Sequence, residues 1–307
     1  MKIAVIGAGA MGSLFGFYLA GADNEVTLVD PWAEHVEAVN RFGLTVLDGD
    51  NLEKKALPRA VTTADAIDSP DLALFFVKAY HTRAAAFETA PVLKANTIVL
   101  TLQNGYGNVE ILSEALPGSK VLAGSTAHGA TVLAPGRIRH AGTGDTVIGL
   151  PGGGSDEDVF RVAALFNRCG LKTATSKEID NIIWGKLIIN AAINPLTALL
   201  KVTNGELLKS EYTLALIEML AGEAAAVASR KGIRLPYADP VTKVKTVADA
   251  TALNRSSMLQ DIEKGRRTEI DFINGAVSRE GRRVGLNTPY NEMASLLIKG
   301  LEEEDGA

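Results

Sequence analysis

Cysteine and histidine are scarce in this chain of 307 residues, and their scarcity excludes several kinds of site. The single cysteine, Cys169, cannot form an internal disulfide, which is typical of proteins from reducing compartments. The four histidines, His35, His81, His128 and His140, are scattered without the spacing of metal ligands. We therefore expect neither a disulfide framework nor a bound metal.

An excess of positive charge is also missing. The chain has 31 basic and 36 acidic residues, a net charge of −5, so a clustered basic surface for nucleic acid is not expected. Met1-Lys2 is followed by a short apolar run and then glycines, unlike a signal peptide. These features predict a cytoplasmic protein that binds no nucleic acid.

Only one apolar segment is long enough to suggest a membrane span, from residue 182 to residue 200. It contains Lys186, Asn190, Asn194 and Pro195, and a lysine with two amides would be costly in lipid. We interpret it as a buried helix of a soluble protein, so no membrane partner is expected.

Strands and helices are expected to alternate in the first half of the chain. Unbroken apolar runs between helical segments indicate a parallel sheet covered on both faces. The predicted strands are 2–6, 25–29, 44–47, a short strand near 60–61, 72–77 and 97–102. The predicted helices are 11–21 and 32–42.

The pattern of predicted secondary structure changes after residue 121. Residues 121–150 predict short, partly antiparallel strands, and 157–169 predict a helix. Everything after Asp180 has a helical pattern. The predicted fold class is an α/β Rossmann-type domain over 1–172, followed by an all-α domain over 173–307 for substrate binding and dimerisation. Such a helical half is compatible with a homodimer.

A glycine motif joins the first predicted strand to the first predicted helix. In a dinucleotide-binding turn the first glycine permits the turn, the second admits a pyrophosphate, and the third allows close packing of helix and strand. The helix N-terminus then faces the phosphates. An ordinary strand–helix turn is the alternative. The motif is Gly7-Ala8-Gly9-Ala10-Met11-Gly12.

Asp30 ends the second predicted strand, about 20 residues after the motif, where a carboxylate can bind the adenosine ribose hydroxyls. It could also cap a helix that begins at Pro31. No lysine or arginine lies between Ser13 and Asn40, so a ribose 2′-phosphate would meet no local cation. Both observations favour NAD(H) as the cofactor.

Polar residues spaced four apart mark the apolar segment of the second half. Lys186, Asn190 and Asn194 share one helix face, with Asn194 expected at a break before Pro195. The stripe is either a structural polar network or a substrate site in which Lys186, with a pKa lowered by burial, acts as the acid. Spacing alone leaves both open.

Glu269 interrupts another apolar stripe, between Ile262 and Ile273 on a helix that Ser256-Ser257 would open and cap. A carboxylate in that position either pairs with a cation or lines a site.

Nearly the whole chain, to about residue 290, resembles the ketopantoate reductase (2-dehydropantoate 2-reductase) family. Together the matching stretches are far more specific than the glycine motif. They are Gly7 to Gly12, Val77 to Ala79, Gln103 to Gly107, Trp184 to Lys186, Asn190 to Thr197, Asn204 to Leu207, Ser256 to Asp261 and Thr268 to Asp271.

The resemblance implies a role for each matching position. Lys186 matches the catalytic lysine, which protonates the substrate carbonyl oxygen as hydride arrives. The substrate-binding positions match Asn190, Asn194, Asn204 and Ser257. The positions around the cofactor and the active-site cleft match Lys78, Asn104, Ala130 and Glu269.

The resemblance implies NADP(H) as cofactor, whereas Asp30-Pro31-Trp32 stands where the family often has an arginine. The resemblance extends to NAD-dependent dehydrogenases of D-2-hydroxy acids such as mandelate. We predict reduction of a 2-oxo acid, 2-dehydropantoate to pantoate, in a cleft between the two domains. The alternatives are the NAD-dependent D-2-hydroxy-acid dehydrogenase and, from another class, a non-catalytic dinucleotide-binding regulator.

Overall fold

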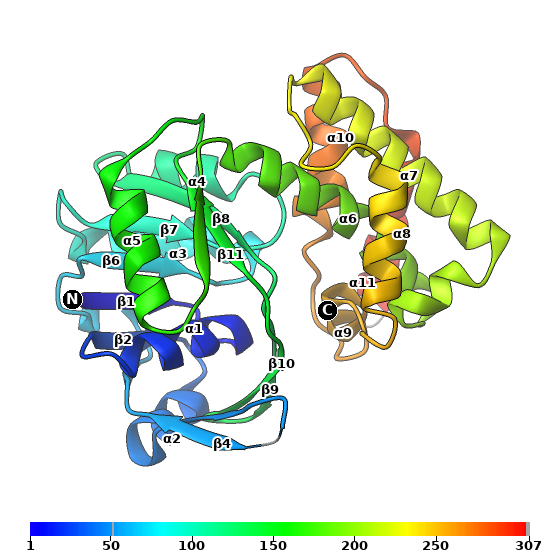
Figure 1. Ribbon diagram of the computed structural model, residues 1–307. Coiled ribbons are helices and arrows are strands. Elements are labelled where there is room, and N and C mark those ends of the chain that lie inside the picture. Colours follow the sequence, from blue (N-terminus) through cyan, green and yellow to red (C-terminus); the bar gives the residue numbers. More distant parts are fainter. Residues whose placement is uncertain (51, 305–307) are drawn as a thin grey trace. The chain divides into compact units, whose positions relative to one another are not determined.

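The computed structural model describes residues 1–50 and 52–304, and contacts divide them into two compact units (Figure 1). The first comprises Met1–Gln103 and Asn108–Ile179, and the second comprises Asn104–Gly107 and the chain from Asp180 onward. The domain change expected after residue 172 falls before a short strand, β12 (Thr173–Ser176), that pairs with the sheet of the first unit. The predicted fold class, an α/β domain followed by an all-α domain, is confirmed.

The first unit is built on a mostly parallel sheet, with strand order β12-β11-β8-β7-β6-β1-β2-β5 within the described residues. Strand β11 runs antiparallel to β8, and β12 runs parallel to β11. The other strands are β1 (Lys2–Ile6), β2 (Glu25–Val29), β5 (Arg59–Val61), β6 (Leu72–Phe75), β7 (Ile98–Thr101), β8 (Lys120–Thr126) and β11 (Thr146–Gly149).

The strand order reverses beside β1. Ile6 at its end pairs with Val29 of β2 on one side and with Phe75 of β6 on the other. The chain builds outward from β1 through β2 and then returns to place β6 on the opposite side. In open parallel sheets a ligand binds outside the carboxyl ends of the strands at such a reversal. The segments after β1, β2, β6 and β7 all leave the sheet at this edge.

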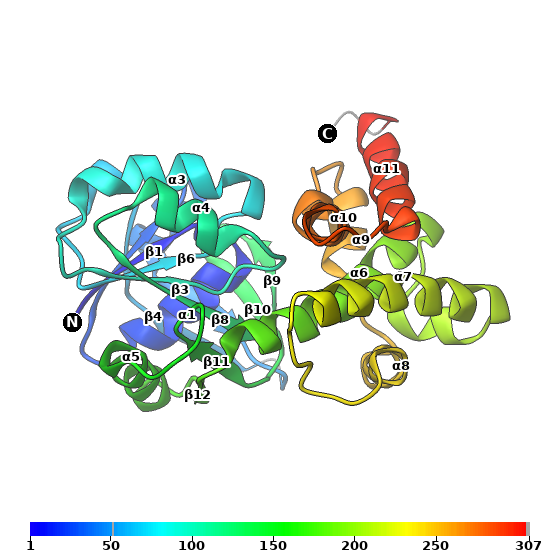
Figure 2. The same ribbon diagram turned by 90° about the horizontal axis from the view of Figure 1, so that it is seen from above.

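Helices cover both faces of this sheet, as Figure 2 shows. One face packs against α3 (Thr82–Thr89) and α4 (Asn108–Ala115), through residues such as Phe75 and Leu112. The other face packs against α1 (Ala10–Ala20) and α5 (Glu157–Arg168), through residues such as Phe15. Helix α2 (Ala33–Phe42) adds to the same core. Burial on both faces explains the unbroken apolar strands.

A second sheet covers the outer side of α1. Its strand order is β4-β3-β10-β9, with β3 (Leu44–Leu47), β4 (Glu53–Ala56), β9 (Gly129–Ala134) and β10 (Arg137–Gly142). Leu14 of α1 packs there against Val46 and Ile138. Helix α1 is therefore enclosed by sheet on two sides.

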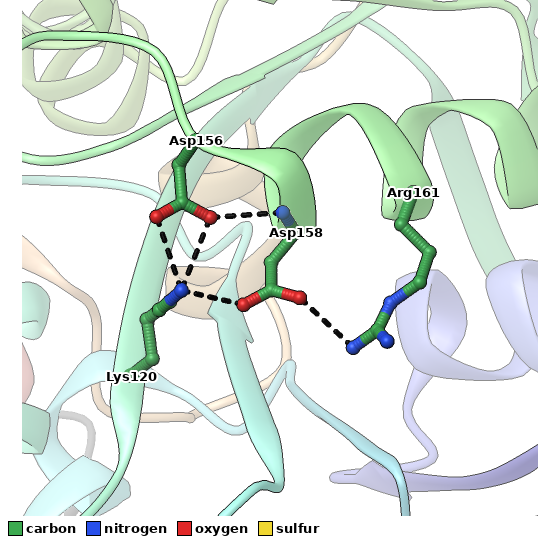
Figure 3. Close-up of polar contacts among 4 residues, drawn as sticks. All are labelled: Lys120, Asp156, Asp158 and Arg161. Carbon is green, nitrogen blue, oxygen red and sulfur yellow. Dashed lines mark hydrogen bonds and ion pairs between the residues drawn. The ribbon is translucent and has the colours of Figure 1, made fainter.

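An ion-pair network closes the start of α5 (Figure 3). Asp156 caps the helix by accepting from the backbone N–H of Asp158 at 2.8 Å. Lys120, on β8, lies 3.0 Å from Asp156 and 2.6 Å from Asp158. Arg161 pairs with Asp158 from the next turn at 2.9 Å. These partly exposed contacts fix the helix start to the sheet and point to no chemistry.

The second unit is helical throughout its described part. Its core contains fully buried Trp184 and apolar residues from every helix. The helices are α6 (Ile179–Leu200, which the contact division splits after its first residue), α7 (Glu211–Arg230), α8 (Pro240–Ala250), α9 (Ser257–Ile262), α10 (Asn274–Arg283) and α11 (Pro289–Glu304).

Helix α6 runs without interruption through Pro195, so the expected break at Asn194 is wrong. Proline lacks an N–H and leaves the carbonyl four residues earlier, that of Ala191, without its helical donor. The side chain of Asn274 replaces that donor, with its Nδ2 at 2.9 Å from the Ala191 oxygen. A side chain distant in the sequence thus keeps the helix continuous.

Two helices, α6 and α7, are long and apolar enough to cross a membrane. In the most apolar part of α6, 67% of the residues are buried within the protein, against 33% for α7. Length and composition are weak evidence for a span, and the burial of α6 agrees with the expected core helix.

Candidate active site

The glycine loop lies at the carboxyl end of β1, beside the strand-order reversal. Gly7 has φ +92°, and a Cβ there would meet the backbone of Val77 at 2.5 Å. A Cβ on Gly12 would collide with the carbonyl oxygen of Gly7. A Cβ on Gly9 would instead meet nothing within 4 Å. Two glycines are therefore required by the fold, whereas Gly9 leaves its backbone open to an approaching group.

The first turn of α1 offers donors to that open side. Gly9 is the N-cap residue, and no side chain caps the helix. The early amide groups of a helix have no intrahelical acceptors and carry the positive end of the helix dipole. An open glycine backbone beside uncapped amides fits the pyrophosphate of a dinucleotide.

Asp30 follows β2, and its backbone N–H donates to Val61 at 3.1 Å. Its Oδ1 accepts from the backbone N–H of Trp32 at 3.0 Å. Helix α2 begins only at Ala33 with Trp32 as N-cap, so the alternative in which Asp30 caps a helix starting at Pro31 is wrong. The carboxylate forms a local turn instead.

Lys78 follows β6 and is half-buried. The segment before it is held by Gln103, whose Nε2 donates to the carbonyl of Val77 at 2.7 Å and to Thr82 Oγ1 at 2.8 Å. Sequence reasoning assigned no role to Gln103, although it lies in one of the matching stretches. Its position just after β7 is the signal that could have identified it.

Ala130 lies on β9, opposite His140 of β10. It packs with the apolar cluster between α1 and the second sheet. The first unit thus holds the glycine loop, Asp30, Lys78 and Ala130.

Lys186 lies on α6 between fully buried Trp184 and nearly fully buried Leu187. Burial lowers the pKa of Lys186 to about 8, and the carboxylate of Glu269 acts in the opposite direction. A lysine with this pKa holds a proton at neutral pH and can release it without a large free-energy cost. The expectation of a lowered pKa is confirmed.

Glu269 is 7% exposed and does not lie on a helix with Ser256. Helix α9 ends at Ile262, and Gly265 takes φ +57° in the turn that follows. Glu269 comes just before a 3₁₀ turn at Ile270–Phe272. The expected continuous helix is therefore wrong. The carboxylate of Glu269 acts electrostatically on a cation, Lys186, and raises its pKa.

Asn190 and Asn194 follow Lys186 along α6 at intervals of one turn. Asn194 is 6% exposed and Asn190 is half-buried. Because α6 is continuous, the three polar side chains share one face of the helix, as the spacing predicted.

Asn204 and Ser257 come from segments packed near α6. The Nδ2 of Asn204 donates to Thr251 Oγ1 at 2.9 Å, while its buried Oδ1 has no hydrogen-bond partner among the described residues. Ser257 is exposed as the first residue of α9. The preceding Ser256 caps α9, as predicted, and accepts from Thr197 of α6 at 2.7 Å.

Asn104 belongs to the second unit although it directly follows the β7 segment. The next residues turn through Gly105, with φ +85°, and the N–H of Tyr106 donates to the carbonyl of Phe272 at 2.8 Å. The loop that carries Asn104 therefore lies on the segment after Glu269.

Tyr237 is a residue that sequence reasoning missed, because nothing in its pattern marks it. Its hydroxyl donates to the carbonyl of Gly185 at 2.8 Å, next to Lys186. Burial raises the pKa of Tyr237, so it stays protonated and remains a donor.

Within the described residues no group of three or more His, Cys, Asp or Glu side chains could hold a metal ion. The first unit offers a glycine loop, and the second offers a lysine, a carboxylate and amides. An α/β unit of this topology, joined to a helical unit in which a carboxylate acts on a lysine of lowered pKa, defines the class of dinucleotide-dependent oxidoreductases.

Comparison with known proteins identifies the family. Models of the N-terminal and C-terminal parts of ketopantoate reductase PanE/ApbA match residues 3–153 and 178–302. A curated 2-dehydropantoate 2-reductase from Pyrococcus horikoshii is 37% identical and covers 100% of this chain and 99% of its own. The chain belongs to the ketopantoate reductase family.

Two solved structures show the same likeness over 100% of both chains. A PanE/ApbA family ketopantoate reductase from Ralstonia eutropha has a TM-score of 0.92 and 32% identity. A D-mandelate dehydrogenase, solved with NADH and anilino(oxo)acetate, also has a TM-score of 0.92 and 32% identity. Both of the enzyme classes that the sequence resembled are therefore represented among the solved structures similar to this chain.

Proposed function

We propose that this protein reduces a 2-oxo acid to a 2-hydroxy acid with a reduced nicotinamide dinucleotide, and that the substrate is 2-dehydropantoate. The observation that carries this proposal is Lys186, half-buried on α6 between buried Trp184 and Leu187, whose pKa is lowered to about 8 and is acted on by Glu269. A curated relative of this family, 37% identical, is named for the same reaction.

The dinucleotide is assigned to the first unit. Gly9 and the uncapped start of α1 are its pyrophosphate site, since both leave backbone donors open. Asp30 is assigned to the adenosine ribose, and Lys78 and Ala130 to the rest of the cofactor. When bound, the cofactor supplies the hydride that adds to the carbonyl carbon.

Lys186 then supplies the proton. As negative charge develops on the carbonyl oxygen, the ammonium group of Lys186 stabilises it and transfers its proton to that oxygen. In the reverse direction neutral Lys186 removes the hydroxyl proton. Glu269 keeps part of the lysine population protonated, because its carboxylate raises the pKa that burial lowers.

The amides and the hydroxyl are assigned to the substrate. Asn190 and Asn194, on the same face of α6 as Lys186, would orient the carboxylate and the hydroxyl of the acid without a second cation. The buried Oδ1 of Asn204 is an acceptor for a substrate hydroxyl, since it has no partner among the described residues. Ser257 adds an exposed hydroxyl.

Asp30 favours a second candidate, an NAD-dependent dehydrogenase of D-2-hydroxy acids. A carboxylate at that position would repel a ribose 2′-phosphate, and the mandelate dehydrogenase with TM-score 0.92 was solved with NADH. A regulator without catalysis would have no use for a lysine of lowered pKa. Assembly as a homodimer and a cytoplasmic location stay predictions.

The deciding experiment is a panel of 2-oxo acids, including 2-dehydropantoate and phenylglyoxylate, assayed with NADH and with NADPH. We expect oxidation of the cofactor with 2-dehydropantoate and its loss in Lys186→Ala. Preference for phenylglyoxylate would establish the second candidate. No turnover with any acid, despite cofactor binding, would establish the regulator.

A further inference from the structure

We infer that Arg279 is a positioning residue that holds the Asn104 loop, residues 104–107, in register with Glu269. This inference deepens the proposed function and rests on it, because Glu269 acts there on Lys186 and Asn104 is a position that the family resemblance places around the cofactor and the active-site cleft. Arg279 itself is not assigned to touch substrate or cofactor. It acts through the two backbone segments that carry those residues.

Arg279 lies on α10 and its two terminal nitrogens reach different segments. Nη2 donates to the carbonyl of Tyr106 at 3.2 Å, and Nη1 donates to the carbonyl of Asp271 at 3.4 Å. Tyr106 comes two residues after Asn104, and Asp271 comes two residues after Glu269. One planar guanidinium therefore joins both segments with a fixed spacing, which a lysine cannot reproduce.

The same two segments are also in direct contact. The Tyr106 N–H donates to the Phe272 carbonyl at 2.8 Å. A Cβ on Gly105 would meet that Phe272 oxygen at 2.5 Å, so only glycine permits the approach. Gly107, at φ +113°, lies under the guanidinium, where a Cβ would be 3.1 Å from Nη2. The loop is shaped to fit against Phe272 and Arg279.

The charge arrangement allows Arg279 to be removed without leaving a buried carboxylate alone. Neighbouring Glu280, whose side chain is 2% exposed, pairs with Lys231 at 2.6 Å and with Arg283 at 2.7 Å. Arg279 approaches Glu280 only at 3.8 Å. The loss of Arg279 therefore affects the two carbonyls more than the core ion pair, so its variants should fold.

The test combines a measurement that does not depend on activity with one that does. In Arg279→Ala, hydrogen–deuterium exchange of the peptide containing residues 104–107 should become about ten- to a hundredfold faster, because charge-assisted hydrogen bonds are lost. For the reaction, kcat should fall by a similar factor with little change in the KM of the 2-oxo acid. Added guanidinium ion should restore part of the kcat lost in Arg279→Ala. The kcat of Arg279→Lys should lie between those of Arg279→Ala and the wild-type enzyme.

Arg282→Ala is the matched control, since Arg282 lies on the same helix in an exposed pair with Glu292 at 3.7 Å. It should leave both measurements unchanged. Wild-type exchange at residues 104–107 in Arg279→Ala would overturn the inference, and so would faster exchange with an unchanged kcat. If the wild-type enzyme reduces no 2-oxo acid, the proposed function fails, and the contribution of Arg279 to kcat fails with it, while exchange still decides whether Arg279 anchors the loop.

Discussion

Glu269 raises the pKa of Lys186, against a burial that lowers it to about 8. The two side chains come from α6 and from the segment after α9, and both lie in the helical unit. Their coupling gives the proposed reaction a definite pH dependence.

The rate of reduction should fall at alkaline pH. Reduction needs protonated Lys186, so kcat/KM should be level below about pH 8 and fall about tenfold per pH unit above it. Oxidation of the 2-hydroxy acid needs neutral lysine and should rise through the same pH. Both profiles are measured with the wild-type enzyme.

The kcat of Lys186→Met should be about 10² to 10⁴ lower than that of the wild-type enzyme. A variant that kept the wild-type rate would show that another group supplies the proton.

Replacing Glu269 with glutamine should move these profiles toward lower pH. The carboxylate raises the pKa of Lys186, so its removal lowers that pKa further and leaves less protonated lysine at neutral pH. The midpoint of the kcat/KM profile reports the change. A shift toward higher pH would contradict the assigned sign of the coupling. Glu263→Gln, at an exposed ion pair with Arg255, serves as the control.

Asp30→Ala should change the choice between the two cofactors. Removing the carboxylate takes away a ribose acceptor and a repulsive charge, so the KM of NADH should rise. The ratio of kcat/KM for NADPH to that for NADH should increase by about ten- to a hundredfold, the effect of about 1.4 to 3 kcal/mol. A strong NADPH preference in the wild-type enzyme would contradict the role given to Asp30.

The glycine loop allows binding and folding to be separated. Gly9→Ala places a methyl group where nothing lies within 4 Å, so the melting temperature should stay unchanged while dinucleotide affinity drops. Gly12→Ala collides with the Gly7 carbonyl and should lower both. Gly118→Ala, also in open space, should change neither. Calorimetric titration and thermal melting give the two readouts, and full affinity in Gly9→Ala would place the phosphates elsewhere.

Three histidines, His35 and His140 buried and His128 half-buried, predict loss of stability in acid. Burial is the main cause that lowers the pKa of His35, His128 and His140 from 6.5. The unfolded chain therefore binds more protons, and stability should be lost as pH falls below about 6.5, down to the folded pKa values. His128→Gln should reduce this loss in urea unfolding curves, whereas exposed His81→Gln should not.

The sequence predicted the parts of the fold that follow from local periodicity. Apolar runs such as 72–77 correspond to β6, and the run from 182 to 200 to the core helix α6. The short strand β12 was missed, because Thr173–Ser176 alternates weakly and becomes a strand only by pairing with β11. The turn between Ile262 and Glu269 was missed for a related reason, since apolar residues on both sides kept a helical spacing.

Some residues of the candidate site could likewise be grouped from the sequence, and others could not. Lys186, Asn190 and Asn194 could be grouped from spacing, because one helix carries all three. Arg279 and Tyr237 could not, since each acts on a backbone carbonyl of a segment distant in the sequence. Carbonyl groups are the same in every residue, so such partners leave no trace in the pattern of side chains.

The donor that Asn274 provides to Ala191 has an evolutionary consequence. The proline at position 195 is tolerated in mid-helix because a side chain elsewhere satisfies the orphaned carbonyl. A relative that exchanged Asn274 for an apolar residue would gain by replacing its proline, and one without the proline would be released from keeping the amide. Substitutions at these two positions are therefore expected to occur together in related sequences.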